Sequence, residues 1–312
     1  MNNKILIDKD VKYAIKNKQP IVSLESTLIS HGLPYPLNIE VAKKSIKVIK
    51  STGSLPATIG IIDGYIKIGL NDEDINILAK KKNVQKISRH NIALAMKKNS
   101  YASTTVASTM MISSLVGIKV FSTGGIGGVH RNSQKTYDIS SDLIELHRKN
   151  MIVVSSGAKS ILDIFKTNEL LETLGVTKIG YKVDNVPGFW CRKTNLNVDL
   201  KINNLQELLK IIENRNLINQ NGSILIYNPV EKKYSIKNND IEKWINKAQK
   251  KAEKYKIKGK ELTPYLLKEI SELSKGKTIK ANMSLIINNA KLAGKIANKM
   301  NKILWKKWDF FF

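Results

Sequence analysis

The stretch from Phe121 to Lys159 constrains the fold more than any other part of the sequence. An apolar run ends in the glycine-rich segment 124–128, a polar segment and a helical pattern follow, and a second apolar run over 151–154 leads into Ser155–Lys159. This layout predicts strand, loop, helix, strand and loop. Because both loops follow strands of a parallel sheet, they open on its carboxyl edge, where α/β proteins bind ligands.

Strand and helix patterns alternate along most of the chain and predict an α/β fold, with a largely parallel central sheet flanked by helices. The part from Ile241 onward is mostly helical in pattern, and we expect a single domain over residues 1–312. The expected strands are 21–24, 56–62, 65–68, 84–87, 119–122, 151–154, 177–183 and 222–227, and the expected helices are 1–19, 38–51, 72–82, 91–98, 104–117, 160–163, 168–174, 205–214, 241–255, 262–273 and 282–304.

The composition is that of a globular enzyme. The 312 residues are 42% hydrophobic, which is enough for a sizeable core. The one cysteine, Cys191, excludes an intramolecular disulfide framework and fits a reducing compartment. No signal peptide is expected, because the first residues lack an apolar core, and no run approaches the roughly 18 apolar residues of a membrane span. We therefore expect a cytoplasmic protein without a membrane partner.

The charge balance is strongly basic. The net charge of +26 arises from 52 Lys and Arg residues against 26 Asp and Glu. Such an excess raises the question of nucleic-acid binding. However, it is nearly all lysine, it is scattered among Asn and Ile, and it forms no arginine-rich stripe or paired aromatic motif. We therefore do not expect a nucleic-acid partner, although the positive field suits a small anionic substrate.

The last residues, 305–312, form an aromatic and basic tail, WKKWDFFF. Three interpretations stay open for it. The tail packs on its own domain, packs on a partner subunit, or is disordered.

Two side chains are candidates for acid–base or nucleophilic chemistry. Glu25 follows the apolar run 21–24, where partial burial would raise its pKa and suit it to general acid–base work. Lys159 follows the small residues 155–158 at the expected start of a helix. The helix N-terminus and nearby cations would lower its pKa there, which makes the neutral amine a Schiff-base nucleophile. A solvated glutamate and an ordinary surface lysine are the plain alternatives.

Four polar residues cluster before the helix in the middle of the opening stretch, namely Asp138, Ser140, Ser141 and Asp142. A serine at this position can cap the helix, whose free N–H groups could bind a phosphate. The two aspartates, four residues apart, could bind a hard cation or hold a water. A capping box with charges near the helix dipole explains the same residues, so both interpretations stay open.

The glycine-rich segment 124–128 resembles a dinucleotide fingerprint only superficially. Gly125 and Gly127 match G-x-G-x-x-G, but His130 stands at the third glycine position. No acidic residue ends a following strand at the spacing that a ribose contact needs, so we reject an NAD site. We expect these glycines to let the backbone approach a ligand closely.

Eight segments occur in one order along the chain: LESTLISHGLPYP, GSLPATIGIIDG, KISR, ASTTVASTMMIS, GIKVFSTGGIGGVHR, YDISSDL, SSGAKSILD and TLGVTKIGY. Together they resemble the pseudouridine 5′-phosphate glycosidase family. The similarity runs from about Pro20 to Arg192 and resumes weakly near 259–264 and 282–289. So many motifs in one order are far more specific than a single glycine-rich loop.

The resemblance implies cleavage of the C–C glycosidic bond of pseudouridine 5′-phosphate to uracil and ribose 5-phosphate. It also implies a homotrimer and one divalent metal per subunit, typically Mn²⁺. By the resemblance, Lys159 forms the Schiff base with ribose C1′, Glu25 donates a proton and Asp138 binds the metal. The substrate-binding positions that it implies are Lys86, the backbone around Val106, Ser140, Ser141 and Asp142.

Further residues are candidates for substrate contacts. Lys86, His130 and Arg131 are possible cations for the 5′-phosphate. Asn282 and Asn289 are candidates to orient sugar hydroxyls or metal-bound waters.

The sequence departs from the family pattern at His90 and Asn91, where the family often has an arginine and an aspartate, and over residues 195–250, which match poorly. Two other functions stay open. One is a basic nucleic-acid-binding protein on an enzyme-like fold, and the other is a glycosidase for another sugar phosphate.

Overall fold

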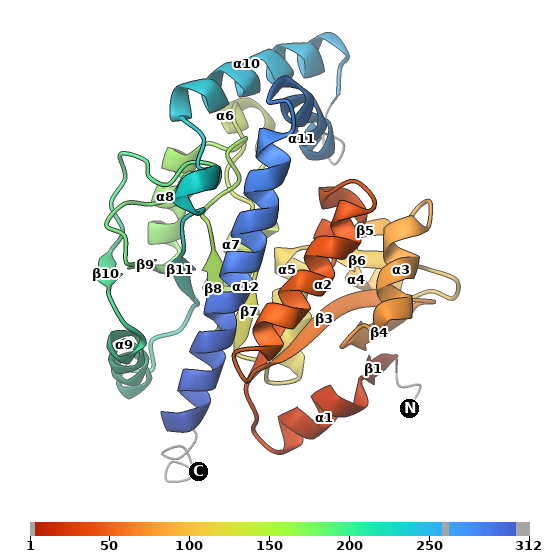
Figure 1. The fold of residues 1–312 in the computed structure, drawn as a ribbon, viewed down its shortest axis with the longest axis vertical. Helices are drawn as coiled ribbons and strands as arrows, with labels where there is room; N and C mark the ends of the chain where they lie inside the picture. The colour runs from red at the N-terminus through yellow and green to blue at the C-terminus, as the bar shows by residue number, and fades with distance from the viewer. Residues whose placement is uncertain (1–3, 258–261, 304–312) are drawn as a thin grey trace.

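The computed structural model describes residues 4–257 and 262–303, and the tail 305–312 with its three interpretations lies outside the described residues. Strands and helices alternate along the chain (Figure 1). The strands are β1 (Ile5–Ile7), β2 (Ile21–Leu24), β3 (Leu55–Ile62), β4 (Tyr65–Ile68), β5 (Gln85–Ile87), β6 (Ala102–Thr104), β7 (Val120–Ser122), β8 (Ile152–Ser155), β9 (Thr177–Tyr181), β10 (Leu200–Ile202) and β11 (Ile224–Tyr227).

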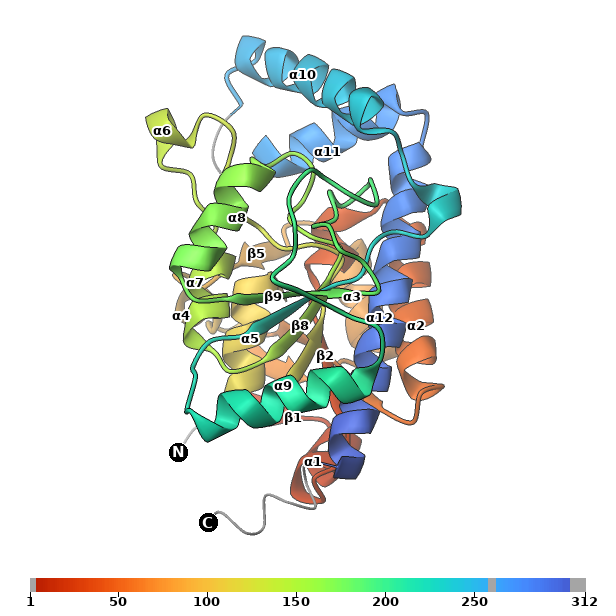
Figure 2. The same cartoon turned by 90° about the vertical axis from the view of Figure 1, so that its left-hand side faces the viewer.

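The helices lie on both sides of these strands (Figures 1 and 2). They are α1 (Lys9–Lys16), α2 (Leu37–Lys50), α3 (Asp72–Lys80), α4 (Ile92–Ala95), α5 (Val106–Leu115), α6 (Ser133–Thr136), α7 (Ser141–Arg148), α8 (Ile164–Thr173), α9 (Leu205–Leu217), α10 (Asn238–Lys254), α11 (Leu262–Leu273) and α12 (Lys277–Ile303), with a π-helical turn η1 (Leu28–Gly32) and a 3-10 turn η2 (Lys232–Tyr234).

The strands form one mixed sheet in the order β1-β4-β3-β2-β7-β8-β11-β9-β10, and β6 joins β3 to β5. Every pair from β3 across to β10 is parallel. Antiparallel pairing occurs between β3 and β4 and between β3 and β6. The expected α/β class with a largely parallel central sheet is thus confirmed.

Alternate residues of the central strands face opposite sides of the sheet, as the period of two requires. Phe121, Val153 and Leu225 pack with apolar residues of α5, α7 and α8 on one face. Val120 and Ile152 pack with residues of α9 and α12 on the other. Because helices cover both faces, β8 is buried at every position, and its first three residues, 152–154, are all apolar.

Helix α12 runs along one face of the sheet, against α2 and beside β2, β7 and β8 (Figures 1 and 2). Helix α12 and the turn after α2 approach closely at Gly294, where a Cβ atom would lie 2.3 Å from Oγ1 of Thr52. The hydroxyl of Ser54 donates a hydrogen bond of 2.8 Å to the Gly294 carbonyl oxygen. A residue without a side chain is therefore required at this contact. Helices α10 and α11 pack on each other beyond the start of α12 (Figure 1).

Four expectations about the elements were wrong. Residues 5–7 form the strand β1, which pairs with β4, and within the described part of this range, 4–19, only residues 9–16 are helical. The strands β6 and β10 were missed, because three residues are too few for a periodic signal. Residues 160–163 are not helical, since α8 begins at Ile164. Helix α12 begins at Lys277, five residues before its expected start.

We expect Gly294→Val to lower the free energy of unfolding by about 1–3 kcal/mol, because its side chain would be forced into Thr52. The control is Lys295→Val, at an exposed position of the same helix, which bears only the lower helix propensity of valine, under about 1 kcal/mol. Urea unfolding of both variants measures the difference. Equal losses in the two variants would contradict the close contact.

Candidate active site

Glu25 follows β2 directly at the carboxyl edge of the sheet and is 7% exposed. Thr123, which follows the neighbouring strand β7, donates a hydrogen bond from its hydroxyl to the Glu25 carboxylate. Burial raises the pKa of Glu25 above its usual range, and the Lys159 charge and the Thr123 hydrogen bond oppose this rise in part. Glu25 therefore holds its proton to a higher pH than a solvated glutamate does.

Lys159 lies half-buried in the loop after β8, and the expected helix start at this residue is wrong. Its backbone N–H donates to the carbonyl oxygen of Ile126, and the carbonyl oxygen of Gly157 accepts the Ile126 N–H in turn. The loop is thus held by backbone hydrogen bonds to the glycine-rich segment 124–128, whereas α8 is capped later, at Asp163. A helix dipole at Lys159 consequently plays no part in its chemistry.

Lys86 comes from β5, and its ammonium lies among the charges of the same site. Burial lowers the pKa of Lys86, and the charge of Lys159 lowers it further, whereas Asp142, Glu25 and Asp138 raise it. Lys86 therefore lies close enough to these four charged groups to interact with each of them electrostatically. The charge of Lys159 thus adds to burial in favouring the neutral amine of Lys86.

The start of α7 is fixed by hydrogen bonds from its own first residues. The hydroxyl of Ser140 accepts the Asp142 N–H at 3.2 Å, which confirms the capping interpretation for this serine. The Asp142 carboxylate, 5% exposed, accepts the N–H of Ala107 at 2.9 Å and of Gly127 at 2.7 Å. Asp142 thereby joins α7 to the N-terminus of α5, where Val106 is the first residue, and to the glycine-rich segment.

The glycines of segment 124–128 make room for protein atoms, contrary to the expectation that they let a ligand approach. A Cβ at Gly125 would lie 2.5 Å from the Phe189 ring, and one at Gly127 would lie 2.2 Å from Oγ of Ser140. At Gly128 it would meet Oγ1 of Thr167 at 2.4 Å. The segment is therefore packed tightly between α7, α8 and the loop after β9.

A second set of contacts joins the Lys86 segment to α7. The hydroxyls of Ser88 and Ser141 lie 2.6 Å apart. Arg89 donates to the carboxylate of Glu145, a residue with no exposed surface. Because Lys86 and the start of α7 belong to distant parts of the chain, we call this pair of contacts the Arg89–Glu145 clamp.

Asp138 and His130 lie together on the rim of the site. The His130 N–H donates to the Asp138 carbonyl oxygen at 3.0 Å, and its Nδ1 lies 3.7 Å from Asp138 Oδ2. Burial lowers the pKa of His130, while the Asp138 charge raises it and the charges of Lys159 and Lys86 lower it. A neutral imidazole follows, which can accept or donate one hydrogen bond but is a poor counter-charge for phosphate.

No group of three His, Cys, Asp or Glu side chains in residues 4–257 and 262–303 is arranged to hold a metal ion. The Asp138 side chain is 41% exposed, however, and its carboxylate is open to solvent. A single exposed carboxylate fits a hard divalent ion that keeps most of its waters and shares the rest of its shell with a phosphate.

Other sequence candidates are engaged by protein partners. Both terminal nitrogens of Arg131 donate to the carboxylate of Glu242 at 2.8 Å. Asn289 is fully buried, and all its side-chain polar atoms bind protein groups. The Oδ1 of Asn282 accepts the Trp190 indole N–H at 2.7 Å. Of these, Arg131 and Asn289 are structural, while Asn282 has a hydrogen bond to the Trp190 ring.

Sequence reasoning missed the residues that position the candidates. Arg89 and Glu145 gave no signal of their own, because each acts through a partner that is distant in the sequence. Thr123 could have been found from its place directly after an expected strand, because Glu25 also directly follows a strand. Nothing in the sequence pairs Arg89 with Glu145.

The sequence also matches a known family over nearly its whole length. The model of the indigoidine synthase A-like protein family covers residues 10–299. The chain belongs to this family. Two curated family members are named pseudouridine-5′-phosphate glycosidase: the protein of Petrotoga mobilis is 49% identical over 95% of this chain and 96% of its own, and that of Caldanaerobacter subterraneus is 45% identical over 97% and 99%.

Solved structures of family members share the fold. A prealnumycin C-glycosynthase in complex with ribulose 5-phosphate superposes with a TM-score of 0.89 at 34% identity, and the match covers 97% of this chain and 98% of that one. An indigoidine synthase A-like protein from Thermotoga maritima gives a TM-score of 0.88 at 34% identity over 96% and 98%. The family match thus includes residues 195–250, where the sequence seemed to depart from it.

We expect Glu25→Gln to stabilise this family member at pH 8 and to leave it unchanged near pH 4. The raised pKa means that Glu25 stabilises the fold fully only below its ordinary pKa of about 4.3, and this stability is lost as the pH rises through the folded value. The glutamine amide of the variant does not titrate and avoids that loss. Melting temperatures of both proteins across this range test the sign, and a gain that is greatest at pH 4 would contradict it.

We expect Arg89→Met to lower the free energy of unfolding by about 1–3 kcal/mol, because Glu145 would remain buried without its partner. The double variant Arg89→Met, Glu145→Met removes both polar groups and should recover most of the loss. Denaturant unfolding of the single and double variants gives the comparison. Losses that simply add in the double variant would show that the clamp does not couple the two residues.

Proposed function

We propose that this chain cleaves pseudouridine 5′-phosphate to uracil and ribose 5-phosphate. The observation that carries the proposal is that Lys86 and Lys159 lie close enough to Glu25, at the carboxyl edge of the parallel strands, to act on its pKa. The curated relatives named for this activity, at 43–49% identity over more than nine-tenths of the chain, support it.

Lys159 is the proposed nucleophile. Its neutral amine attacks ribose C1′ as the C1′–O4′ bond opens, and the nitrogen lone pair then expels the uracil C5 as the C1′–C5 bond breaks. The resulting iminium is hydrolysed by water, which releases ribose 5-phosphate and returns the amine.

Glu25 is the proposed proton donor to the uracil C5. The carbon leaving group carries developing negative charge, and it departs only if a proton is delivered to it. A buried carboxyl with a raised pKa holds its proton to a higher pH than a solvated one does, and the Thr123 hydroxyl fixes its direction. The same residue can withdraw the proton when the reaction runs toward synthesis.

Substrate binding is proposed for Lys86, His130, Asn282, the Val106 backbone and the start of α7, that is Ser140, Ser141 and Asp142. Lys86 is the proposed cation for the phosphate, since Arg131 is held by Glu242. Asp138 would hold a divalent ion, which we propose to be Mn²⁺. When bound, such an ion neutralises phosphate charge.

We also propose a homotrimer in the cytoplasm. Large apolar side chains that stand exposed support association, for example Tyr137 at 85% and Phe165 at 60%. The single cysteine supports a reducing compartment. Among the described residues, no helix combines the length and the apolar character that a membrane crossing needs.

The test is uracil release from pseudouridine 5′-phosphate in the presence of a manganese salt, followed by chromatography. We expect Lys159→Ala to lower the rate on the order of 10³-fold or more, since the covalent route is lost. The control is Lys166→Ala, an exposed lysine of α8 paired with Asp163, which should keep near-normal activity. Absence of uracil with the unchanged protein would overturn the function.

Borohydride reduction in the presence of ribose 5-phosphate identifies the nucleophile separately. We expect the sugar adduct on the peptide that contains Lys159. An adduct on Lys86 would keep the activity but reverse the assignment of the two lysines. Replacing pseudouridine 5′-phosphate by other C- and N-nucleotides then tests the alternative of another sugar phosphate, which the related C-glycosynthase raises.

A further inference from the structure

Arg131 follows His130 in the loop after β7 and joins three parts of the chain. Its Nη1 and Nη2 donate to Oε2 and Oε1 of Glu242 on α10, both at 2.8 Å. Nη2 also donates to the backbone carbonyl oxygen of Ser160, at the longer distance of 3.4 Å. Because Ser160 follows Lys159 directly, the guanidinium links α10 to the residue after the proposed nucleophile.

The pair with Glu242 fixes the direction of the guanidinium. A carboxylate that accepts from both terminal nitrogens holds this planar group in one orientation, which a lysine ammonium in the same place would not achieve. The third nitrogen, Nε, is buried and has no hydrogen-bond partner among the described residues. The side chain is 23% exposed, and its terminal nitrogens are directed at protein oxygens. We therefore do not expect Arg131 to bind the substrate phosphate.

Helix α10 gives Glu242 a fixed position. Its neighbours Ile241 and Ile245 are buried along the same helix. They belong to the apolar core that also contains Ala158 and Leu162, which lie on either side of Lys159 in the chain. The carboxylate thus reaches Arg131 from a helix that packs in one core with the loop after β8.

Lys159 lies between two backbone anchors. Its own N–H donates to the carbonyl oxygen of Ile126 at 3.1 Å, and the Asp163 N–H donates to a carbonyl oxygen two residues before Arg131 at 2.9 Å. Among the described residues, the hydrogen bond from Arg131 is the one that holds the Ser160 carbonyl oxygen between these anchors. Without it, the peptide group that follows Ser160 is freer to rotate.

We propose that Arg131, oriented by Glu242, is a positioning residue for Lys159. The proposal rests on the proposed function, in which the Lys159 amine attacks ribose C1′. A nucleophile must lie about 3–3.5 Å from the carbon that it attacks, and a misplacement of about 1 Å can cost about 10²-fold in rate. A small movement of the backbone after Lys159 therefore slows the reaction, although Arg131 touches no reacting atom.

Kinetics of uracil release test the proposal with Arg131→Met. We expect kcat to fall about 10–100-fold, while KM for pseudouridine 5′-phosphate stays within about threefold of normal, because the guanidinium is held by protein groups. A KM at least 10-fold higher at unchanged kcat would overturn the proposal and assign Arg131 to substrate binding. An unchanged kcat with unchanged KM would overturn it as well.

A double variant tests whether Glu242 acts through Arg131. Glu242→Gln alone should lower kcat by less than Arg131→Met does, since the amide keeps one acceptor for the guanidinium. Once Arg131 is methionine, the same change should lower kcat no further. Losses that multiply in the double variant would overturn the proposal, because the two residues would then act independently.

Amide hydrogen exchange, measured by mass spectrometry without substrate, follows the loop itself. We expect the peptide that spans residues 157–163 to exchange faster in Arg131→Met, because the N–H groups of Lys159, Leu162 and Asp163 lose protection. Unchanged exchange would overturn the proposal. This measurement does not need the reaction, so a failure of the unchanged protein to release uracil rejects the proposed function and leaves the loop measurement valid.

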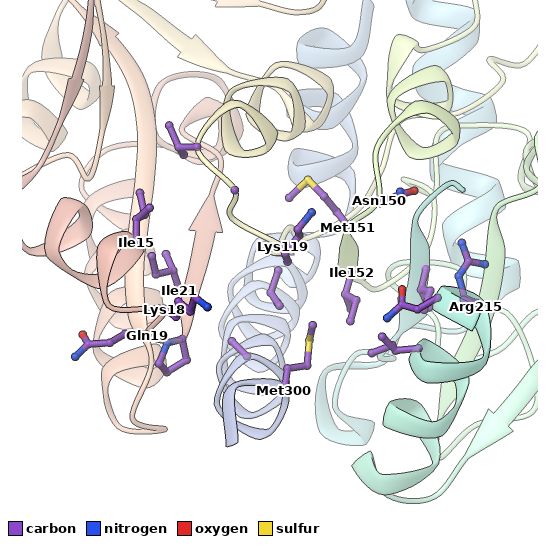
Figure 3. Close-up of a pocket in the computed structure, with 18 of the residues that line it drawn as sticks. Ile15, Lys18, Gln19, Ile21, Lys119, Asn150, Met151, Ile152, Arg215 and Met300 are labelled. Carbon is purple, nitrogen blue, oxygen red and sulfur yellow. The ribbon is translucent and has the colours of Figure 1, made fainter. Parts of the chain in front are cut away.

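Two control variants separate positioning from a general loss of stability. Lys251→Met breaks the 2.7 Å ion pair between α10 and α11, which involves no residue of the Lys159 loop. Met300→Ala removes packing in the pocket formed by the first residues of β2, β7, β8 and β11 (Figure 3), at the other end of these strands. Both controls should keep kcat and loop exchange within about twofold of normal. A loss of kcat in either control equal to that in Arg131→Met would overturn the proposal.

Discussion

The buried amide of Asn289 is the interaction on which the candidate active site depends. From α12, its Nδ2 donates to the Thr123 carbonyl oxygen at 2.8 Å and to Oγ of Ser156 at 3.1 Å, while its Oδ1 accepts from Asn228 at 3.0 Å. These partners follow β7, β8 and β11 directly. One side chain is therefore hydrogen-bonded to three neighbouring loops and fixes their positions relative to one another. An apolar residue of the same size would leave those buried polar groups without partners, at about 1–3 kcal/mol each.

In the candidate site, burial and neighbouring charges have opposite effects on the pKa values of Glu25 and Lys86. Burial favours the protonated form of Glu25 and the neutral form of Lys86, whereas their attraction favours the ionised form of both. The presence of Lys159 breaks this balance, because it lowers the pKa of both Glu25 and Lys86. Three ionisable groups in one partly dry space thus adjust one another, and a substrate phosphate adds a fourth charge to the same balance. The protonation states are therefore a property of the group as a whole.

The sequence predicted the fold class and the position of Glu25 because both rest on local patterns: a buried apolar run, then an acid. Lys159 was placed correctly after β8 but with the wrong backbone, since small residues suit a helix start and a packed loop equally well. The Arg89–Glu145 clamp joins residues 56 positions apart, and the Asp142 bond to Ala107 joins residues 35 apart. Such pairs depend on how α7 meets β5 and α5, which periodicity does not encode.

The position of Asn289 near the end of the sequence has a consequence for the order of folding. Asn289 and Thr123 are 166 residues apart, so the ribosome has made nearly the whole chain before the loops after β7 and β8 receive their common partner. If the parallel strands associate before α12 is made, the polar groups of these loops still lack their hydrogen-bond partner Asn289. Contacts of such long sequence separation form late and slowly. A nascent or truncated chain without α12 consequently has the sheet but no catalytic geometry, and activity appears only when synthesis is almost complete.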